Sequence, residues 1–342
     1  MTAAARAEAL AAAGHSAEAA AAIAQGIAAG EADALVIAAQ WRLFGVFPDV
    51  LGPRDPAAAK VLLARAADAG DVSARVLLAY LTANPATGPA DAAAARRHFA
   101  AAAAVEPRLA AQLAVLDALA RRPLPAPERL AESPDVVRFP RLIDAATCAW
   151  LIAAAKAALA PSLIVDPLSG AARPDPVRRA HAMSFGPLDE DLVVSAVADR
   201  IAAVSGTARA AAEPLAVLAY APGGEYRPHL DTIPGLANQR AVTVLTYLND
   251  DFTGGATTFP DAGRDARRDA GSNAGRDSGL TITPRTGDAI VFRVADAGGR
   301  PLANARHAGA PVTQGVKYLC SRWIRLAAHD IWGPTNIGES AR

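Results

Sequence analysis

The pattern of apolar and polar positions changes in character once along the chain. Residues 1–122 are rich in Ala and Leu at helical spacing and contain almost no β-branched runs. From about residue 137 onward, Val, Ile, Tyr, Phe and Thr alternate with polar residues and turn signals. Apolar positions three to four apart predict amphipathic helices, and alternation predicts strands. The sequence therefore predicts an α+β chain, with an N-terminal helical region followed by a β-rich domain.

The helical region shows internal similarity. The stretch G-I-A-A-G-E-A-D-A-L-V-I-A-A-Q resembles A-A-D-A-G-D-V-S-A-R-V-L-L-A-Y further along. Gly30 and Gly70 each stand where one helix would end and the next begin, and Asp55 and Asp91 are placed to cap Ala-rich helices. The two glycines are forty residues apart. Paired helices that repeat at about this spacing are typical of a solenoid, and the pattern resembles Sel1-like repeats, relatives of the tetratricopeptide repeat. The alternative is an Ala-rich helical bundle with chance similarity.

The two regions are joined by a proline-rich segment. Residues 123–136 contain Pro123, Pro125, Pro127 and Pro134, which predict a semi-extended linker. The domain expected to follow, 137–328, should hold helices at 145–159, capped by Asp144, and at 192–204. Strands are expected at 136–139, 214–221, 226–231, 241–249, 256–259, 280–283, 288–294, 305–308 and 315–326.

Many short strands at this spacing indicate a sandwich or barrel. The run 261–279 is polar and punctuated by glycine, so we expect an inserted surface loop there. Residues 329–342 are expected to form a tail.

Composition narrows the setting. The formal net charge is +0, with 34 Lys and Arg against 34 Asp and Glu, so no global attraction to nucleic acid or anionic membrane is expected. No apolar run approaches the length that spans a bilayer. The N-terminus carries Glu8 and does not resemble a signal peptide. The two cysteines, Cys148 and Cys320, give no disulfide framework. We expect a cytoplasmic protein.

The strongest chemical signal is the run Y-A-P-G-G-E-Y-R-P-H-L-D, from Tyr220 to Asp231. His229 and Asp231 are two apart, and on a β-strand such residues share a face. With a second imidazole, for which His307 is the candidate, they would form a two-His-one-carboxylate triad, which binds Fe(II) by one face and leaves other positions open. A bare H-x-D motif arises by chance on many surface strands, so it needs support from elsewhere in the chain.

Lys317 supplies part of that support. It follows His307 by ten residues and is expected on the next strand. A buried ammonium is acceptable when an anion pairs with it. The distal carboxylate of a 2-oxo diacid that chelates iron through its other end would be such an anion. The alternative is that Lys317 extends along a strand edge with its charge in water.

Four motifs in order carry a family resemblance. They are Y-x-x-G-x-x-Y-x-x-H-x-D, Y-L-N-D-D-F-x-G-G-x-T-x-F-P, P-R-x-G-D-A-I-V-F and H-A-G-x-P-V-x-x-G-x-K-x-x-x-x-x-W-I-R. Over about residues 139–326 the chain resembles the prolyl 4-hydroxylase branch of the Fe(II)/2-oxoglutarate-dependent dioxygenases. The resemblance implies a double-stranded β-helix (jelly-roll) oxygenase domain that uses Fe(II), with 2-oxoglutarate and O₂ as co-substrates and ascorbate to keep the iron reduced.

The resemblance also assigns roles to residues. It implies that His229, Asp231 and His307 are the catalytic iron ligands and that Lys317 binds the distal carboxylate of 2-oxoglutarate. The remaining positions that match the co-substrate pocket are Tyr220, Tyr247 and Thr257. Ordinary aromatic packing is the alternative for the two tyrosines.

Three further features of the resemblance concern the surroundings of this site. Gly254 and Gly255 match a turn before a barrel strand. Tyr226 could pack against the loop over the iron. Arg178 or Arg179 stands where family members show an R-T-S-like run that shapes the substrate entrance, although the rest of that run does not match.

The function implied is hydroxylation of a C–H bond, of a prolyl or other residue in a protein or peptide, with oxidative decarboxylation of 2-oxoglutarate to succinate and CO₂. The helical repeats would then dock the substrate. Other readings stay open. They are a hydroxylase of a free amino acid or other small-molecule metabolite, an inactive oxygenase-fold adaptor acting through its repeats, and a cupin-like metal isomerase or hydrolase, which would have no need of Lys317.

Overall fold

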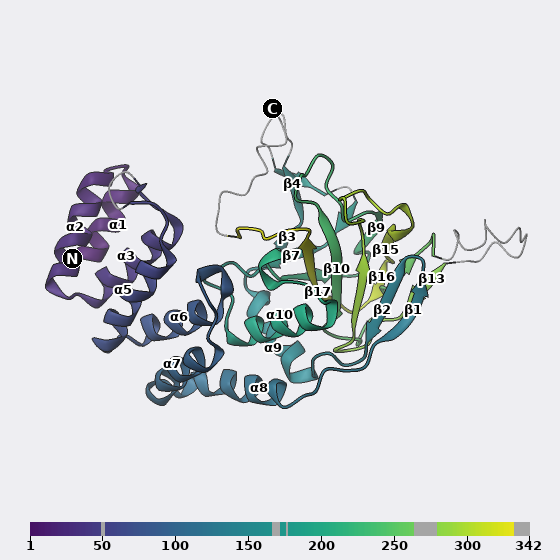
Figure 1. Cartoon of the computed structure of the whole chain (residues 1–342), viewed down its shortest axis with the longest axis horizontal. Helices are drawn as coiled ribbons and strands as arrows, with labels where there is room; N and C mark the ends of the chain where they lie inside the picture. Colours follow the sequence, from purple (N-terminus) through teal and green to yellow (C-terminus); the bar gives the residue numbers. More distant parts are fainter. Residues whose placement is uncertain (49–51, 166–171, 176, 263–278, 332–342) are drawn as a thin grey trace, which may run out of the picture. The chain divides into compact units, whose positions relative to one another are not determined.

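The computed structural model describes residues 1–48, 52–165, 172–175, 177–262 and 279–331. Backbone contacts divide the chain into two compact units (Figure 1). The helical unit takes in Met1–Ala114 and Pro187–Ser195, and the β unit takes in Val115–Gly186 and Ala196–Ile331. The division falls inside helix α8, Ala110–Ala120, before the boundary expected at residue 122. No helix in the described ranges is long and apolar enough to cross a membrane.

In the helical unit each helix packs on its neighbour in sequence. Such nearest-neighbour stacking is the behaviour of helical repeats, while the specific repeat type stays a prediction. Short 3₁₀ turns follow α6 and α7, at Pro85–Thr87 and Pro107–Leu109. The helices are α1 (Ala3–Ala12), α2 (Ser16–Ala29), α3 (Ala32–Phe44), α5 (Pro56–Asp68), α6 (Val72–Ala83) and α7 (Ala92–Val105).

The predicted helix ends of this unit are confirmed. Gly30 terminates α2 with a φ of 74°, a conformation that favours glycine. The side chains of Asp55 and Asp91 accept hydrogen bonds from backbone amides in the first turns of α5 and α7. Alanine and glycine let the helices approach closely: a Cβ on Gly26 would lie 2.5 Å from the Cβ of Ala34. The Ala-rich composition therefore serves helix packing as well as helix propensity.

The β unit is built around two antiparallel sheets (Figure 1). The larger sheet has the strand order β1-β2-β14-β10-β17-β8-β7-β3, and the smaller has the order β13-β12-β15-β9-β6. The larger contains β1 (Glu128–Glu132), β2 (Asp135–Phe139), β14 (Ala289–Arg293), β10 (Arg240–Tyr247), β17 (Lys317–Arg325), β8 (Ala216–Tyr220), β7 (His181–Ser184) and β3 (Ala160–Pro161). The smaller contains β13 (Leu280–Ile282), β12 (Thr257–Phe259), β15 (His307–Gly309), β9 (Glu225–His229) and β6 (Arg178–Arg179).

The two sheets share one core. Phe259 of β12 meets Phe292 of β14 edge to face, with ring centroids 5.0 Å apart. The core cluster also joins Leu218 and Leu245 of the large sheet to Ile282 of the small one. Two antiparallel sheets that close on one core form the predicted jelly roll. Two-stranded ribbons flank them: β4 (Leu163–Val165) with β5 (Ala172–Pro174), and β11 (Thr253–Gly254) with β16 (Val312–Gln314).

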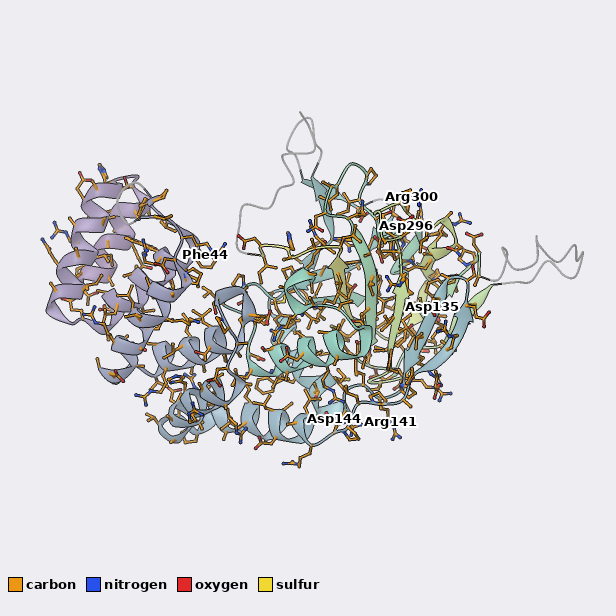
Figure 2. All side chains as sticks on the ribbon, viewed as in Figure 1. Phe44, Asp135, Arg141, Asp144, Asp296 and Arg300 are labelled. Carbon is orange, nitrogen blue, oxygen red and sulfur yellow. The ribbon has the colours of Figure 1, made fainter. Side chains whose placement is uncertain are left out.

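Helix α9 (Ala145–Lys156) packs against the large sheet. The predicted cap, Asp144, is labelled in Figure 2. Its side chain accepts a hydrogen bond from the Thr147 amide. Buried Cys148 of this helix lies 3.9 Å from the carbonyl oxygen of Tyr247. Helix α9 thus supports β10, the strand that carries Tyr247, from outside the core. The other expected helix is α10, Leu192–Ser205.

Several expectations about the β unit need correction. The segment 123–136 is not simply a linker, because it contains β1 and the start of β2. Arg200 holds its beginning by donating to the carbonyls of Arg122 and Pro123. The short strands β3, β4, β5, β6, β7, β11 and β16 were not expected. The expected loop 261–279 and the tail 329–342 lie largely outside the described residues.

A further correction concerns the strand expected at 226–231. The strand β9 ends at His229, so Asp231 lies just beyond it. Spacing of two on one strand therefore does not explain why the carboxylate faces the imidazole. The other expected strands are present with ends shifted by a few residues.

Candidate metal centre and its pocket

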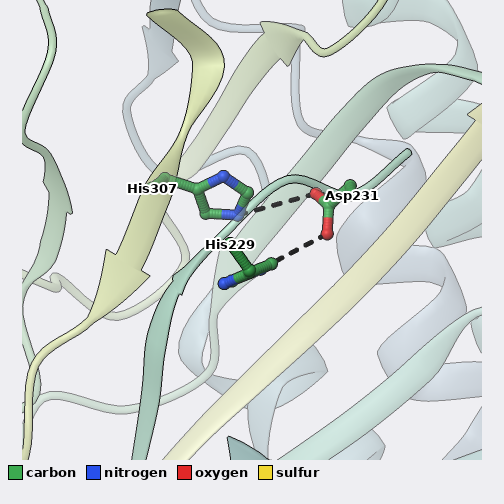
Figure 3. A group of neighbouring side chains, drawn as sticks. All are labelled: His229, Asp231 and His307. Atoms are coloured by element: carbon green, nitrogen blue, oxygen red, sulfur yellow. Dashed lines mark ion pairs between the residues drawn. The ribbon is translucent and has the colours of Figure 1, made fainter. Parts of the chain in front are cut away.

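The three side chains predicted to bind metal come together in the β unit. His229 ends β9 and His307 begins β15, and the two residues pair directly across the antiparallel ladder. Asp231 completes the group from the turn after β9 (Figure 3). One potential ligand atom from each side chain lies within 4.8 Å of the others. Residues distant in sequence are thus held within reach of one small ion.

The orientation of both imidazoles suits metal binding. Nδ1 of His229 lies 2.8 Å from the Arg227 carbonyl oxygen, and Nδ1 of His307 lies 3.1 Å from that of Ala305. A carbonyl oxygen only accepts, so the neutral rings carry their proton on Nδ1 and present the lone pair of Nε2. Those Nε2 atoms lie 3.5 Å and 3.6 Å from the two carboxylate oxygens of Asp231.

Electrostatics favour the metal-binding forms of Asp231 and His307. Burial alone would raise the pKa of the Asp231 carboxyl, but His307, His229 and the hydroxyl of Thr243 outweigh it and hold the pKa below its usual range. Burial lowers the pKa of His307, favouring the neutral ring. A carboxylate and a neutral imidazole are the forms in which Asp231 and His307 can bind a metal.

One potential ligand atom of the group lacks a hydrogen-bond partner, as an atom that binds a metal would. Nε2 of His229 is buried and has no hydrogen-bond partner in the described part of the chain. A buried polar atom without a partner destabilises the fold unless a bound group, such as a metal ion, contacts it. Two nitrogens and one oxygen on one side of an ion form the donor set typical of non-haem Fe(II). The residues therefore fit Fe(II).

Lys317 stands at the first position of β17, opposite Tyr220 of β8. Its side chain is buried, with 2% of its surface exposed, which rules out the alternative of a lysine extended along the sheet edge. Nζ donates to the Gly255 carbonyl oxygen at 2.7 Å. Burial lowers the pKa of the ammonium to about 8. A buried cation neighboured by neutral groups is suited to receive an anion.

Two tyrosine rings lie near that ammonium. Nζ of Lys317 lies 5.5 Å from the ring centre of Tyr220 and 5.7 Å from that of Tyr247. The Tyr247 hydroxyl lies 2.8 Å from the Thr257 hydroxyl. Burial raises the pKa of both tyrosines, so the phenols stay neutral donors. These tyrosines pack in the core and also face the cation, so packing and binding are not exclusive alternatives.

The turn at Gly254 and Gly255 makes room for the lysine. Both residues have positive φ, of 77° and 65°. A Cβ on Gly255 would lie 3.1 Å from Cδ of Lys317 and 2.8 Å from the Phe252 ring. Glycine at 255 thus permits both the turn and the position of its carbonyl beneath Nζ.

One pocket connects the metal group to Lys317. Its lining includes three leucines, Leu218, Leu245 and Leu319. Its lining comprises Arg178, Leu218, Tyr220, Tyr226, His229, Asp231, Leu245, Thr257, His307, Ala308, Gly309, Lys317, Leu319, Ser321 and Trp323.

At the side of the pocket, Tyr226 stacks on His229 with ring centroids 3.4 Å apart. The guanidinium of Arg178 lies over the ring of Tyr226, 5.4 Å from the ring centre, and Arg178 lines the pocket. Arg179 instead pairs with Glu225 at 3.1 Å, with a largely exposed side chain. Of the two arginines that the sequence left open, Arg178 is the one that faces the pocket.

Sequence reasoning missed three pocket-side residues. Ser321 and Trp323 continue the inward face of β17 from Lys317 at intervals of two, a signal that strand alternation would have supplied. Ser321 Oγ and Trp323 Nε1 are buried without hydrogen-bond partners among the described residues. Thr243, which donates to Asp231 at 2.6 Å, gave no sequence signal.

Comparison with known proteins agrees with this geometry. The family model of the 2OG-Fe(II) oxygenase superfamily matches residues 215–325, which hold the triad and Lys317. Prolyl 4-hydroxylase 1 of Arabidopsis thaliana is 30% identical over 208 residues, covering 59% of this chain and 72% of that protein. The chain belongs to the 2OG-Fe(II) oxygenase superfamily. It is a 2-oxoglutarate-dependent dioxygenase that uses Fe(II), 2-oxoglutarate and O₂.

Two further relatives are matched over a smaller share of their own length. Probable prolyl 4-hydroxylase 4 of Arabidopsis thaliana is 29% identical over 193 residues, which is 64% of that protein. Prolyl 4-hydroxylase subunit alpha-2 of Gallus gallus is 28% identical over 216 residues, 37% of its length. Among solved structures, the viral collagen prolyl hydroxylase of Paramecium bursaria Chlorella virus-1 has a TM-score of 0.42 at 25% identity, covering 56% of this chain and 96% of that one.

Proposed function

We propose that this chain hydroxylates a C–H bond of a prolyl or other residue in a protein or peptide, and that 2-oxoglutarate is decarboxylated to succinate and CO₂ in the same turnover. The observation that carries the proposal is the single pocket that links the His–Asp–His group to the buried cation Lys317. An isomerase or hydrolase of the same fold has no use for a buried ammonium at that place. An adaptor that only binds has no use for three side chains that bring their potential ligand atoms within 4.8 Å of one another.

His229, Asp231 and His307 would hold the Fe(II). When bound, Fe(II), 2-oxoglutarate and O₂ supply the oxidation, in which one oxygen atom enters the substrate and the other enters succinate. The protein contributes position and surroundings. The carbonyls of Arg227 and Ala305 fix the two imidazoles, and Tyr226 covers one face of His229.

Lys317 would bind the distal carboxylate of 2-oxoglutarate by a charge-assisted hydrogen bond. Its ammonium is held in place by the Gly255 carbonyl and faces two tyrosine rings. The neutral hydroxyls of Tyr247 and Thr257, which bond to each other, would add uncharged partners for the same carboxylate. The apolar side chains Leu218, Leu245 and Leu319 would exclude water from the length of the co-substrate.

A peptide substrate is favoured by the relatives, which are named prolyl 4-hydroxylases. Arg178 lines the pocket where a substrate would approach the metal group, and its guanidinium could donate to peptide carbonyls. The direct test is incubation of the enzyme with proline-containing peptides, Fe(II), ascorbate and 2-oxoglutarate. We expect succinate and peptide with one added oxygen in equal amounts. Succinate formed equally without peptide, and faster with a free amino acid, would contradict a peptide substrate.

The helical unit would dock that peptide. A groove in this unit is lined by Gln40, Ser73, Val76, Leu77 and Tyr80, and Ser73 is exposed within it. Ser73→Arg should fill the groove and raise KM for a long peptide while leaving peptide-independent 2-oxoglutarate turnover unchanged. Val61→Arg, at an exposed position of α5, is the matched control. An unchanged KM in Ser73→Arg would argue against docking there.

A further inference from the structure

Asp231 lacks the support that its neighbour in the metal group has. His229 is the last residue of β9 and pairs with His307 across the ladder. Asp231 follows the strand's end and lies in a turn before Gly235. A carboxylate on irregular backbone would be free to rotate and shift, yet a metal site requires its ligands fixed within a fraction of an ångström. Some other element must therefore hold this residue.

The strand β10 supplies a contact to its side chain. Thr243 Oγ1 donates to Oδ2 of Asp231 at 2.6 Å. Thr243 is fully buried and lies in the middle of β10, which is hydrogen-bonded on one side to β14 and on the other to β17. A β-branched side chain in a strand has few rotamers. The donor thus occupies a fixed position and can fix the rotation of the carboxylate.

The same strand supplies a contact to the backbone of Asp231. Arg240, at the start of β10, donates from Nη1 to the Asp231 carbonyl oxygen at 3.3 Å. Its guanidinium is in turn held by Glu213, at 2.8 Å and 2.6 Å from the two carboxylate oxygens. The guanidinium also lies 4.4 Å from the Trp323 ring centre. Arg240 is therefore immobilised on two sides before it reaches Asp231.

We propose that Thr243 and Arg240 are positioning residues for the metal site, which together hold the side chain and backbone of Asp231 in its ligating geometry. Partners behind a metal ligand change metal affinity by about 10- to 100-fold when they are removed. The inference rests on the metal site itself and is independent of which substrate is hydroxylated. It assigns to β10 a role that neither residue's sequence context indicates.

The test measures binding of Mn(II) alone to the metal-free full-length protein, by electron paramagnetic resonance of free Mn(II). Thr243→Val keeps the shape of the side chain and removes the donor, and should weaken Mn(II) binding by about 10- to 100-fold. Thr243→Ser keeps the hydroxyl donor and should lose much less Mn(II) affinity than Thr243→Val. Equal affinity in Thr243→Val and the unaltered protein would overturn the proposal.

A matched control separates positioning from general damage to the strand. Thr246 is also fully buried on β10, and its hydroxyl has no hydrogen-bond partner among the described residues. Thr246→Val should leave Mn(II) affinity unchanged. If Thr243→Val does not fold, Thr243→Ser still decides, because a serine variant that lost Mn(II) affinity while melting normally would overturn the proposal.

The arginine is tested with its own control. Arg240→Met removes the donor to the Asp231 carbonyl, whereas Arg325→Met removes a second donor to Glu213, 2.9 Å from its carboxylate oxygen. We expect weaker Mn(II) binding in Arg240→Met alone, at equal thermal destabilisation. Equal losses in both variants would reduce Arg240 to a structural residue. Failure of the unaltered protein to bind Mn(II) would instead contradict the metal site.

Discussion

His229 and His307 lie directly opposite each other in the pairing of β9 with β15, with imidazole centroids 4.3 Å apart. Both rings turn Nδ1 to a backbone carbonyl and Nε2 toward Asp231. The pairing means that sheet register sets the distance between two metal ligands. A one-residue slip would turn one ring to the other face of the sheet. The metal site and the fold of the smaller sheet therefore depend on the same hydrogen bonds.

The first prediction concerns the carboxylate. Asp231→Ala should abolish succinate formation, because it removes one of three ligands and the anion that attracts the metal. The measurement is 2-oxoglutarate decarboxylation under saturating Fe(II). Asp296→Ala serves as the control, since that carboxylate pairs with Arg300 at 2.8 Å at the surface (Figure 2). Normal decarboxylation by Asp231→Ala would contradict its role as a ligand.

The second prediction concerns the cation. Lys317→Met should raise KM for 2-oxoglutarate by about 10- to 100-fold, since a hydrogen bond to a charged group contributes about 1.5–3 kcal/mol. A 2-oxo acid without the distal carboxylate, such as pyruvate, is the control ligand. Its weak binding should be equal in Lys317→Met and the unaltered enzyme. An unchanged KM for 2-oxoglutarate would mean that another residue binds the carboxylate.

The third prediction is a pH dependence of co-substrate binding. Burial lowers the pKa of Lys317 to about 8 in the free protein, from 10.5. The protonated form binds the carboxylate, so affinity for 2-oxoglutarate should be full below pH 8 and fall above it. Binding measured by calorimetry between pH 7 and pH 9.5 should show the fall, and Lys317→Met should not. A flat profile in the unaltered protein would contradict the assignment.

Folding stability should depend on the protonation of Lys317 in the opposite direction to co-substrate affinity. Between pH 8 and 10.5 the unfolded chain binds the proton that the folded chain has released. The contribution of Lys317 to folding stability therefore increases with pH over that window. Thermal denaturation of the free protein, compared with Lys317→Met, isolates this contribution. If the contribution of Lys317 to folding stability decreased with pH over that window, its pKa would not be lowered in the folded state.

The fourth prediction concerns the turn beneath Lys317. Gly255→Ala should be destabilised and should raise KM for 2-oxoglutarate, because its Cβ would meet Phe252 at 2.8 Å and Lys317 at 3.1 Å. Gly235→Ala is the matched control, with a φ of 78° and no heavy atom within 4 Å of the added Cβ. It should show the backbone strain alone, about 1–2 kcal/mol. Equal KM values in both variants would mean that Gly255 has no part in placing the lysine.

Much of the fold and the centre of the site could be predicted from the chain. Alternation predicted the long strands, and the resemblance of four ordered motifs to the oxygenase family implied that His229, His307 and Lys317 belong to one site. Strands β6 and β7 could not be predicted, because β6 has only 2 residues and the run H-A-M-S of β7 does not alternate between apolar and polar positions. Strand β1 was missed because prolines and charged residues around it favour a linker.

The support of the site was harder to foresee than its ligands. Asp231 was placed on the strand with His229, whereas the structure holds it from β10. Thr243 resembles any other threonine of a buried strand in the sequence, and only its hydrogen bond to Asp231 indicates a role at the metal site. The choice between Arg178 and Arg179 also required the sheet, since adjacent strand residues face opposite sides. Tertiary contacts between distant strands decided these points.

The most direct test of the account is an anaerobic absorption titration of the metal-free protein with Fe(II) and then 2-oxoglutarate. Co-substrate chelated to iron in the pocket predicts a visible metal-to-ligand charge-transfer band, which should be absent in His307→Ala and should need more 2-oxoglutarate in Lys317→Met. Iron bound without such a band in the unaltered protein would contradict the proposed site for 2-oxoglutarate. A band retained in His307→Ala would contradict the metal centre.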